Sequence, residues 1–139
     1  MKNVKIAVFD TNVLVSGLLS PSGSCGRIVE LLNKGMLAAA YDSRISIEYQ
    51  DVLKRPEFAF PHFEIDVLIQ NIFAQGSLIT VSPENYLTSL PDPDDSAFAE
   101  CAIEIGCPLV TGNMKHFPKQ KTKNAIILTP KEFMETILQ

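Results

Sequence analysis

The 139-residue sequence contains no tryptophan, two histidines and three cysteines. Cys25, Cys101 and Cys107 cannot all pair with one another, and they form neither a CxxC motif nor a Cys/His cluster with the spacing of a zinc site. The two histidines, His62 and His116, are not spaced as metal ligands either. We therefore expect reduced thiols, as in a cytoplasmic protein, and no zinc site of the Cys/His type.

Long apolar runs are also missing. No stretch of 18 apolar residues occurs, and the first apolar run ends at Asp10, which makes it too short for a signal peptide or a membrane span. The sequence shows no internal repeat, low-complexity tract or linker. We expect a single domain over residues 1–139 that does not associate with a membrane.

Basic residues are slightly fewer than acidic ones. Lys and Arg number 12 and Asp and Glu number 16, which gives a net charge of −4. This balance argues against a generally basic protein that coats nucleic acid, but it allows a local basic patch. The hydrophobic fraction of 46% is typical of a globular domain with its own core.

Apolar runs bounded by turn residues predict strands, and apolar residues at helical spacing predict helices. The expected strands are residues 4–9, 37–41, 78–81, 108–111 and 125–129. The expected helices are residues 24–34, 43–55 with Ser43 as cap, 63–74, 95–106, and one that begins at Pro130. This alternation predicts a three-layer α/β/α sandwich with a central, mostly parallel sheet. Ligands of such sheets bind at the carboxyl ends of the strands.

Acidic residues are expected near this edge. Asp10 directly follows the first strand, where a helix cap or a turn would also explain an aspartate. Glu48 shares one face of its helix with Ile45, Tyr49 and Val52. A carboxylate on an apolar face is costly to bury unless it binds a metal ion. The alternatives for Glu48 are an ion pair with an Arg or Lys, or a position at the edge of the apolar stripe from which it reaches water.

Asp95 repeats this pattern at the start of the fourth helix. It shares a face with apolar residues, whereas Glu100 and Glu104 point the opposite way and are expected to be exposed. Asp92 and Asp94 stand beside Asp95. The helix dipole favours acids at this position, but it explains three acids within four residues less easily.

Asn113 follows the strand at residues 108–111. Its side-chain carbonyl can bind a hard cation, and the alternative is a turn residue that tolerates left-handed backbone geometry. Carboxylates that converge on one edge repel one another unless a cation lies between them or some stay protonated. Oxygen ligands favour Mg²⁺ or Mn²⁺. No G-x-S-x-G motif and no P-loop motif occurs.

Four segments, taken together, resemble the PIN domain family. They are residues 9–14 (FDTNVL), Glu48 ahead of Val52 and Leu53, residues 92–95 (DPDD) with Ala102 seven residues after Asp95, and residues 109–113 (LVTGN). Each segment is weak alone, but their order and spacing are specific and extend over essentially the whole chain. Residues 48–56 (EYQDVLKRP) are similar to a segment of PIN-type toxins from toxin–antitoxin systems.

The resemblance implies the α/β/α sandwich and a Mg²⁺- or Mn²⁺-dependent ribonuclease that cleaves RNA, usually single-stranded. The catalytic metal ligands that it implies are Asp10, Glu48 and Asp95, with Asp92 or Asp94 assisting. Asn12 and Thr111 match positions that hold the acids by hydrogen bonds. The resemblance also implies an antitoxin protein as a possible partner.

One position departs from the family pattern. The fourth acidic position, two residues after the threonine, is Asn113 in this chain. The loss of one negative charge weakens a second metal site. A catalytically degenerate PIN fold that binds RNA or a protein is therefore a second hypothesis. A phosphatase-like enzyme that uses Asp10 is a third, but it needs a second aspartate where this chain has Asn12.

Basic side chains follow Asn113 directly. Four of the twelve basic residues lie in one short stretch, at Lys115, Lys119, Lys121 and Lys123. We expect Lys115, Lys119 and Lys121, together with Arg44, to contact RNA phosphates, with a solvated loop as the alternative.

Three phenylalanines, Phe58, Phe60 and Phe63, lie at the start of the helix at residues 63–74 and are expected to belong mostly to the core. In PIN-type toxins the surface near such helices forms a homodimer interface or accepts an antitoxin segment. The resemblance therefore also predicts a homodimer.

Overall fold

The computed structural model describes residues 4–137 of the chain. Its strands are β1 (Lys5–Phe9), β2 (Leu37–Tyr41), β3 (Ser77–Leu78), β4 (Leu109–Val110) and β5 (Ile127–Leu128). They form one sheet in the order β3-β2-β1-β4-β5, and every pairing within it is parallel. The predicted parallel sheet is confirmed, although β3, β4 and β5 are shorter than the sequence pattern suggested.

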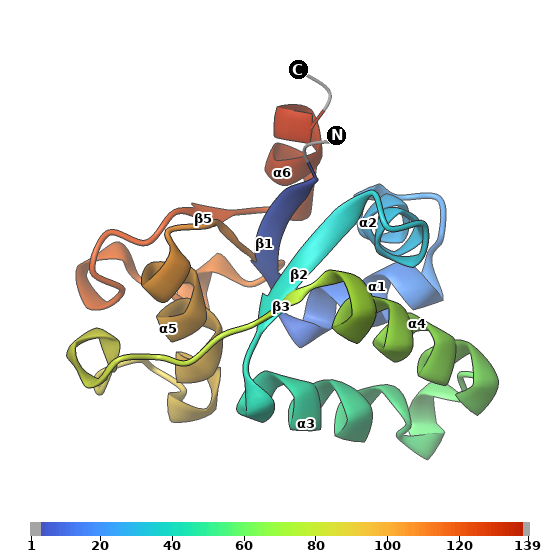
Figure 1. Cartoon of the computed structure of the whole chain (residues 1–139), viewed down its shortest axis with the longest axis horizontal. Helices are drawn as coiled ribbons and strands as arrows, with labels where there is room; N and C mark the ends of the chain where they lie inside the picture. Colours follow the sequence, from blue (N-terminus) through green and yellow to red (C-terminus); the bar gives the residue numbers. More distant parts are fainter. Residues whose placement is uncertain (1–3, 138–139) are drawn as a thin grey trace.

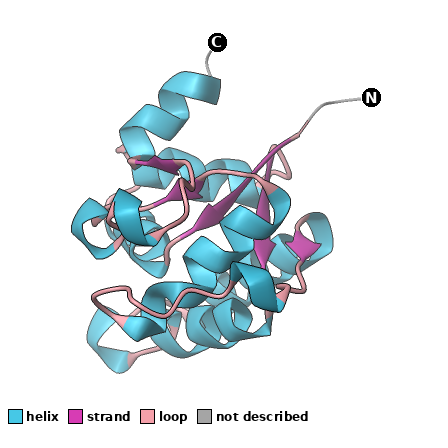
Figure 2. Ribbon diagram, turned by 90° about the vertical axis from the view of Figure 1, so that its left-hand side faces the viewer, coloured by secondary structure: helices cyan, strands magenta, loops and turns pink. Residues whose placement is uncertain are grey.

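Helices surround this sheet (Figures 1 and 2). They are α1 (Thr11–Leu19), α2 (Ser24–Asn33), α3 (Ser43–Leu53), α4 (His62–Gln75), α5 (Ser96–Ile105) and α6 (Pro130–Ile137). Short 3₁₀ turns complete the chain, among them residues 93–95 before α5 and residues 114–116 and 119–121 after β4. The predicted α/β sandwich is confirmed. Among the helices of residues 4–137, none has the length and hydropathy of a membrane span.

The sequence pattern did not predict α1, which follows β1 directly. Its sequence, TNVLVSGLL, is rich in β-branched and small residues, which are weak helix formers. Packing explains the helix, because α1 and α2 lie against each other. A Cβ atom at Gly17 would lie 2.4 Å from the carbonyl oxygen of Cys25, so glycine is what allows this close approach.

The cap of α3 also differs from the expected one. Asp42, rather than Ser43, accepts a hydrogen bond from the Ile45 amide at 3.0 Å. Asp42 directly follows β2, so this aspartate at the sheet edge caps a helix, as short polar side chains commonly do.

The core lies on both faces of the sheet. Val8 and Phe9 of β1 are fully buried, and the Phe9 ring meets Phe133 of α6 edge to face at 5.6 Å. Tyr49 of α3 and Phe98 of α5 are also buried, as the apolar faces of their helices predicted. The core therefore fixes α3, which carries Glu48, and α5, which begins directly after Asp95, against the sheet.

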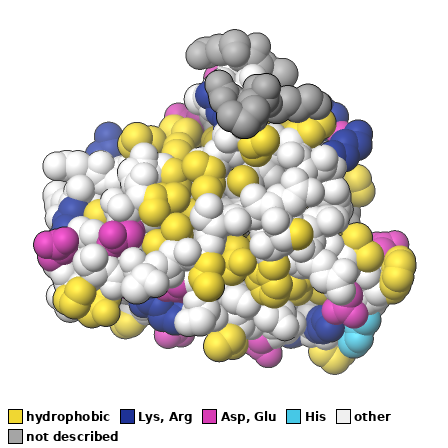
Figure 3. All heavy atoms as spheres, viewed as in Figure 1, with side chains coloured by type: hydrophobic (Ala, Val, Ile, Leu, Met, Phe, Trp, Pro, Cys, Tyr) yellow, Lys and Arg dark blue, Asp and Glu magenta, His cyan; other side chains and the backbone are white. Residues whose placement is uncertain are grey.

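The expectation for the phenylalanines near α4 was wrong in part. Phe58 and Phe60 are half-buried and stack on each other, but Phe63 is 78% exposed. The inward face of α4 is formed by aliphatic residues instead, namely Ile65, Leu68, Ile69 and Ile72. Other apolar side chains reach the surface in the middle of the face shown in Figure 3, whereas charged groups lie mostly near its rim.

Glu100 is not exposed, contrary to the prediction from helical periodicity. Only 3% of its surface is accessible, because the segment between β3 and α5 covers this face of the helix. Its carboxylate accepts a hydrogen bond from the Leu87 amide at 2.8 Å and pairs with Arg44 at 2.9 Å. Glu104, one turn later, is half-buried and holds the Ser82 amide at 2.8 Å. Both glutamates therefore fasten this segment to α5.

We predict that Glu100→Ala lowers the free energy of unfolding by about 2–4 kcal/mol, because it leaves a buried amide and a partly buried guanidinium without their acceptor. Urea denaturation followed by circular dichroism measures the loss. Glu104→Ala is the matched control and should cost less, since its site is open to water. Equal losses for the two variants would contradict the proposed role of Glu100.

Candidate active site

Asp10 lies at the carboxyl end of β1, 6% exposed. It occupies the N-cap position of α1, but its side chain makes no capping hydrogen bond. Its Oδ2 instead accepts hydrogen bonds from Thr111 Oγ1 at 2.9 Å and Asn12 Nδ2 at 3.2 Å. Asp10 therefore stands at the cap position, as one alternative expected, and both side chains that were expected to hold its carboxylate do so.

Glu48 is brought to the same edge by α3. The hydroxyl of neighbouring Tyr49 donates to the carbonyl of Phe9, the last residue of β1, and this bond docks α3 against the end of the strand. Glu48 itself is half-buried and accepts a hydrogen bond from the Thr11 hydroxyl. Within residues 4–137 its carboxylate has no Arg or Lys partner, so the ion-pair alternative fails. Its half-buried position agrees with a side chain at the edge of the apolar face that reaches water.

Asp95 is the last residue of the 3₁₀ turn before α5, and its side chain is 14% exposed. Its buried Oδ2 makes no hydrogen bond within the described part of the chain. The ring of His116 lies beside it, with Nδ1 2.9 Å from this oxygen. Sequence spacing gave His116 no role. The only signal for it was its position three residues after Asn113, in the loop that leaves the carboxyl edge.

The other predicted acids lie around these three. Asp92 caps the 3₁₀ turn by accepting the Asp94 amide at 3.0 Å. Asp94 is exposed and lines a cavity of about 300 Å³ together with Glu48. Asn113 turns its amide nitrogen toward Nε2 of His116, at 3.0 Å.

The acids influence one another's charge. Burial raises the pKa of Asp10, and a hydrogen bond from Thr111 opposes this shift. Burial also raises the pKa of Glu48, with further increases from the charges of Asp10 and Asp94. For Asp95, burial and the charges of Asp10 and Asp92 raise the pKa to about 6. All three carboxylates thus hold their protons more tightly than in water, which is expected where negative groups gather without a cation.

The carboxylate oxygens of Asp10, Glu48 and Asp95 are chemically suited to bind a hard divalent cation. The oxygens belong to carboxylates, and the buried Oδ2 of Asp95 has no hydrogen bond to satisfy it. As the side chains stand, however, no group of three or more His, Cys, Asp and Glu residues among residues 4–137 is arranged so that it could hold a metal ion.

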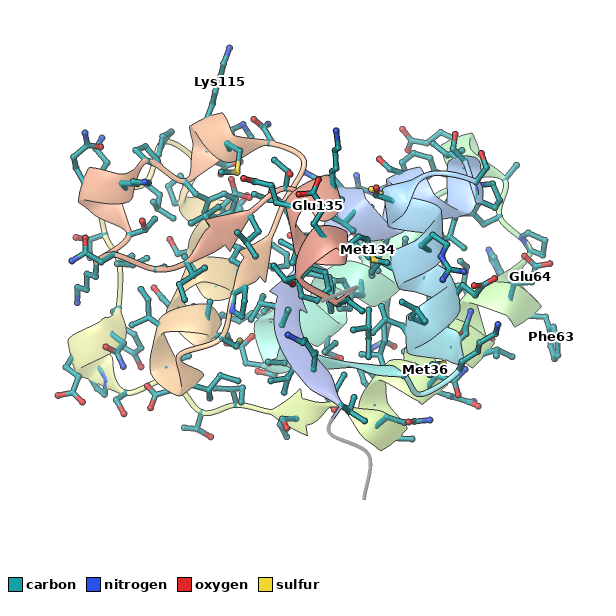
Figure 4. The ribbon with its side chains drawn as sticks, turned by 90° about the horizontal axis from the view of Figure 1, so that it is seen from above. Met36, Phe63, Glu64, Lys115, Met134 and Glu135 are labelled. Atoms are coloured by element: carbon teal, nitrogen blue, oxygen red, sulfur yellow. The ribbon has the colours of Figure 1, made fainter. Side chains whose placement is uncertain are left out.

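The loop after β4 carries the predicted basic side chains. Lys115, Lys119 and Lys121 are exposed, and Figure 4 shows Lys115 projecting away from the body of the molecule. Buried Phe117 and Thr122 anchor the loop, and the Thr122 hydroxyl donates to the Pro118 carbonyl at 3.2 Å. The lysines therefore extend from two fixed 3₁₀ turns rather than from an open coil.

Arg44 is placed differently from the lysines. Its guanidinium contacts Asp42 at 2.7 Å and Glu100 at 2.9 Å. Two carboxylates around one guanidinium leave a local net charge of −1, so Arg44 is poorly suited to attract a phosphate.

The sequence profile of the PIN domain matches residues 6–115, a span that runs from β1 through β4 and contains all the acidic residues described above. The chain belongs to the PIN domain family. It is 27% identical over 145 residues to the uncharacterized protein MJ1680 of Methanocaldococcus jannaschii, with 97% of this chain and 94% of that protein covered.

The PIN fold is also found in a solved structure. The crystal structure of VapBC2 from Rickettsia felis, bound to a DNA fragment from its promoter, contains a chain similar to this one with a TM-score of 0.58. The two chains are 20% identical, and the similarity covers 89% of this chain and 98% of that one. At this identity the similarity supports the PIN fold alone.

The raised pKa of Asp95 predicts a pH-dependent stability without metal. Because the folded state binds this proton more tightly than the unfolded state, the contribution is present below about pH 4 and is lost as pH rises from about 4 through 6. We expect Asp95→Asn to be more stable than the wild type by about 3 kcal/mol at pH 7.5 in EDTA, and nearly equal at pH 4. Denaturation at both pH values tests this. A constant difference between the two proteins would contradict it.

Proposed function

We propose that this PIN domain is a divalent-metal-dependent ribonuclease that hydrolyses phosphodiester bonds, most readily in single-stranded RNA. The observation that carries the proposal is the convergence of Asp10, Glu48 and Asp95 from three separate elements on one sheet edge. Each has a raised pKa, and none is paired with an Arg or Lys among residues 4–137. Perturbed carboxylates that lie together are typical of catalytic sites.

Asp10 and Asp95 are the proposed direct ligands of Mg²⁺ or Mn²⁺. Glu48 would contribute through water, with Asp92 or Asp94 assisting. A bound divalent ion would neutralise the charge of the phosphate and activate a water molecule for attack. Asn12 and Thr111 hold the Asp10 carboxylate in one orientation, and Thr11 does the same for Glu48. Asn113 would have to give up its contact with His116 to act as a ligand.

We predict that Asp10→Asn and Asp95→Asn abolish metal-dependent cleavage of a labelled single-stranded RNA, a loss of at least about 100-fold, while the fold persists. The assay compares Mn²⁺, Mg²⁺ and EDTA, with single-stranded DNA as a second substrate. Glu64→Gln is the control, because Glu64 is exposed in the first turn of α4, away from the acidic site (Figure 4). Cleavage by either Asp variant at the wild-type rate would refute the assignment.

The loop after β4, which carries Lys115, Lys119 and Lys121, is the proposed contact for the RNA backbone. Removal of the acids at positions 10, 48, 92, 94 and 95 from the charge count leaves 12 positive and 11 negative side chains, so the rest of the molecule is nearly neutral. Lys115, Lys119 and Lys121 make no salt bridge within the described residues, so their charges are available to phosphates. Arg44 stays a weaker part of this prediction because of its two carboxylate partners.

Charge reversal of Lys119 and Lys121 should weaken RNA binding and flatten its salt dependence. For a single strand, each phosphate that the protein neutralises adds about 0.7 to the slope of log affinity against log salt, so the slope of the double variant should be smaller by about 1.4. Binding is measured in the Asp10→Asn background to prevent cleavage. Lys34→Glu, on the exposed end of α2, is the control. An unchanged slope would favour a loop that is merely solvated.

The proposed biological role is that of a cytoplasmic toxin in a toxin–antitoxin system. The resemblance of residues 48–56 to PIN-type toxins supports this role, and so does the similar fold found in VapBC2. The corresponding partners are an antitoxin protein and a second copy of this chain. Exposed Phe63 on α4 and Ile47 on α3 supply apolar surface for such contacts.

The degenerate PIN fold is the second candidate, and neutral Asn113 is the observation that favours it. Such a scaffold would bind Mn²⁺ weakly and cleave nothing in the assay above. The phosphatase hypothesis loses support from the position of Asn12. Its amide nitrogen holds Asp10 and its carbonyl oxygen accepts the Gly112 amide at 3.3 Å, so it braces the site instead of serving as an acid.

A further inference from the structure

Each of the three acids has a close side-chain neighbour that can hydrogen-bond. Asp10 has Asn12 and Thr111, and Glu48 has Thr11. Asp95 makes no side-chain hydrogen bond in the described part of the chain, and its close neighbour is His116 at 2.9 Å. The position of its carboxylate therefore depends on that ring.

The ring of His116 is itself held by Asn113. An amide nitrogen can only donate, so Nδ2 of Asn113, 3.0 Å from Nε2, requires Nε2 to accept. In the neutral ring the proton then resides on Nδ1, the atom that faces Asp95. The ring therefore turns an N–H toward the buried Oδ2 of Asp95, 2.9 Å away, and this contact is how it can orient the carboxylate.

Asn113 also supports the other side of the site. Its backbone amide donates to Thr111 Oγ1 at 3.0 Å, and the Thr111 hydroxyl donates to Asp10 at 2.9 Å. Asn113 thus contacts the residue that holds Asp10 and the residue that faces Asp95. A carboxylate at this position could not donate to Nε2, whereas an amide can.

We propose that His116 is a positioning residue for Asp95 and that Asn113 is the brace that orients His116. The asparagine at the fourth acidic position is then a functional replacement that keeps two aspartates in place for one divalent ion. The proposal rests on the metal site proposed above, and it goes further by giving Asn113 and His116 a joint role.

The first test uses Mn²⁺ alone as the probe. Electron paramagnetic resonance of free Mn²⁺ gives the affinity of the full chain at fixed pH. We expect His116→Ala and Asn113→Ala each to weaken binding about tenfold, the size of effect typical for residues that orient metal ligands. The double variant should be no weaker than either single variant, because both act through one contact with Asp95. His116→Asn, which keeps an amide near the position of Nδ1, should recover part of the loss.

Two controls separate this proposal from the proposed metal site. His62→Ala changes the other histidine, exposed at the start of α4, and should bind Mn²⁺ like the wild type. Asp95→Asn should lose binding altogether. If Asp95→Asn loses Mn²⁺ but His116→Ala binds it normally, the positioning role is overturned and the metal site stands. If the wild type and Asp95→Asn bind Mn²⁺ equally weakly, both are overturned.

A second test needs no metal. Nitrogen-15 spectra of the histidine rings report which nitrogen carries the proton. We expect the Nδ1–H form for His116 in the wild type and a shift toward the Nε2–H form in Asn113→Ala, with His62 unchanged. A wild-type ring in the Nε2–H form would overturn the bracing role of Asn113. Thermal melts confirm that each variant is folded.

Discussion

Burial of the Asp10, Glu48 and Asp95 carboxylates without a cation is the constraint on which the surrounding structure depends. Burial at the edge of the sheet raises the pKa of all three, and repulsion from neighbouring acids adds to the increase for Glu48 and for Asp95, whose pKa rises to about 6. The chain does not neutralise the acids with guanidinium or ammonium groups among its described residues. Hydroxyl and amide groups hold Asp10 and Glu48 instead, and an imidazole ring lies against Asp95. A cation that binds there would relieve the cost of burying these carboxylates.

The position of Arg44 fits this arrangement. It lies close enough to line the same cavity as Glu48 and Asp94, yet its guanidinium is fully engaged by Asp42 and Glu100. A freely moving arginine beside the acids would compete with a metal ion for them. The two carboxylates that hold Arg44 therefore keep the site acidic as well as stabilising the join between α3 and α5.

Much of the fold and of the candidate site could be predicted from the sequence, because it is encoded locally. Alternating strands and helices fix a parallel sheet, and a residue that follows a strand must lie at its carboxyl edge, as Asp10 does. Helical periodicity placed Glu48 beside Tyr49 on the inward face of α3. The same reasoning failed for Glu100, since periodicity gives the direction of a side chain but not what covers it. Residues 79–92, which form little regular structure, cover that face. The helix α1 was missed because its stability comes from packing against α2 rather than from its own residues. His116 was missed because a turn of three residues, which no spacing rule describes, brings its ring to Asp95.

The bond from Thr111 to Asp10 joins residues 101 positions apart in the chain, and this separation matters during synthesis. Until the ribosome has released residues 109–116, β1 lacks its β4 neighbour and Asp10 lacks the hydroxyl that orients it. Asp95 likewise lacks its histidine. A nascent or truncated chain therefore carries the acids without the geometry that makes them a site. Any chemistry of this site therefore has to wait until residues 109–116 have emerged and paired with β1.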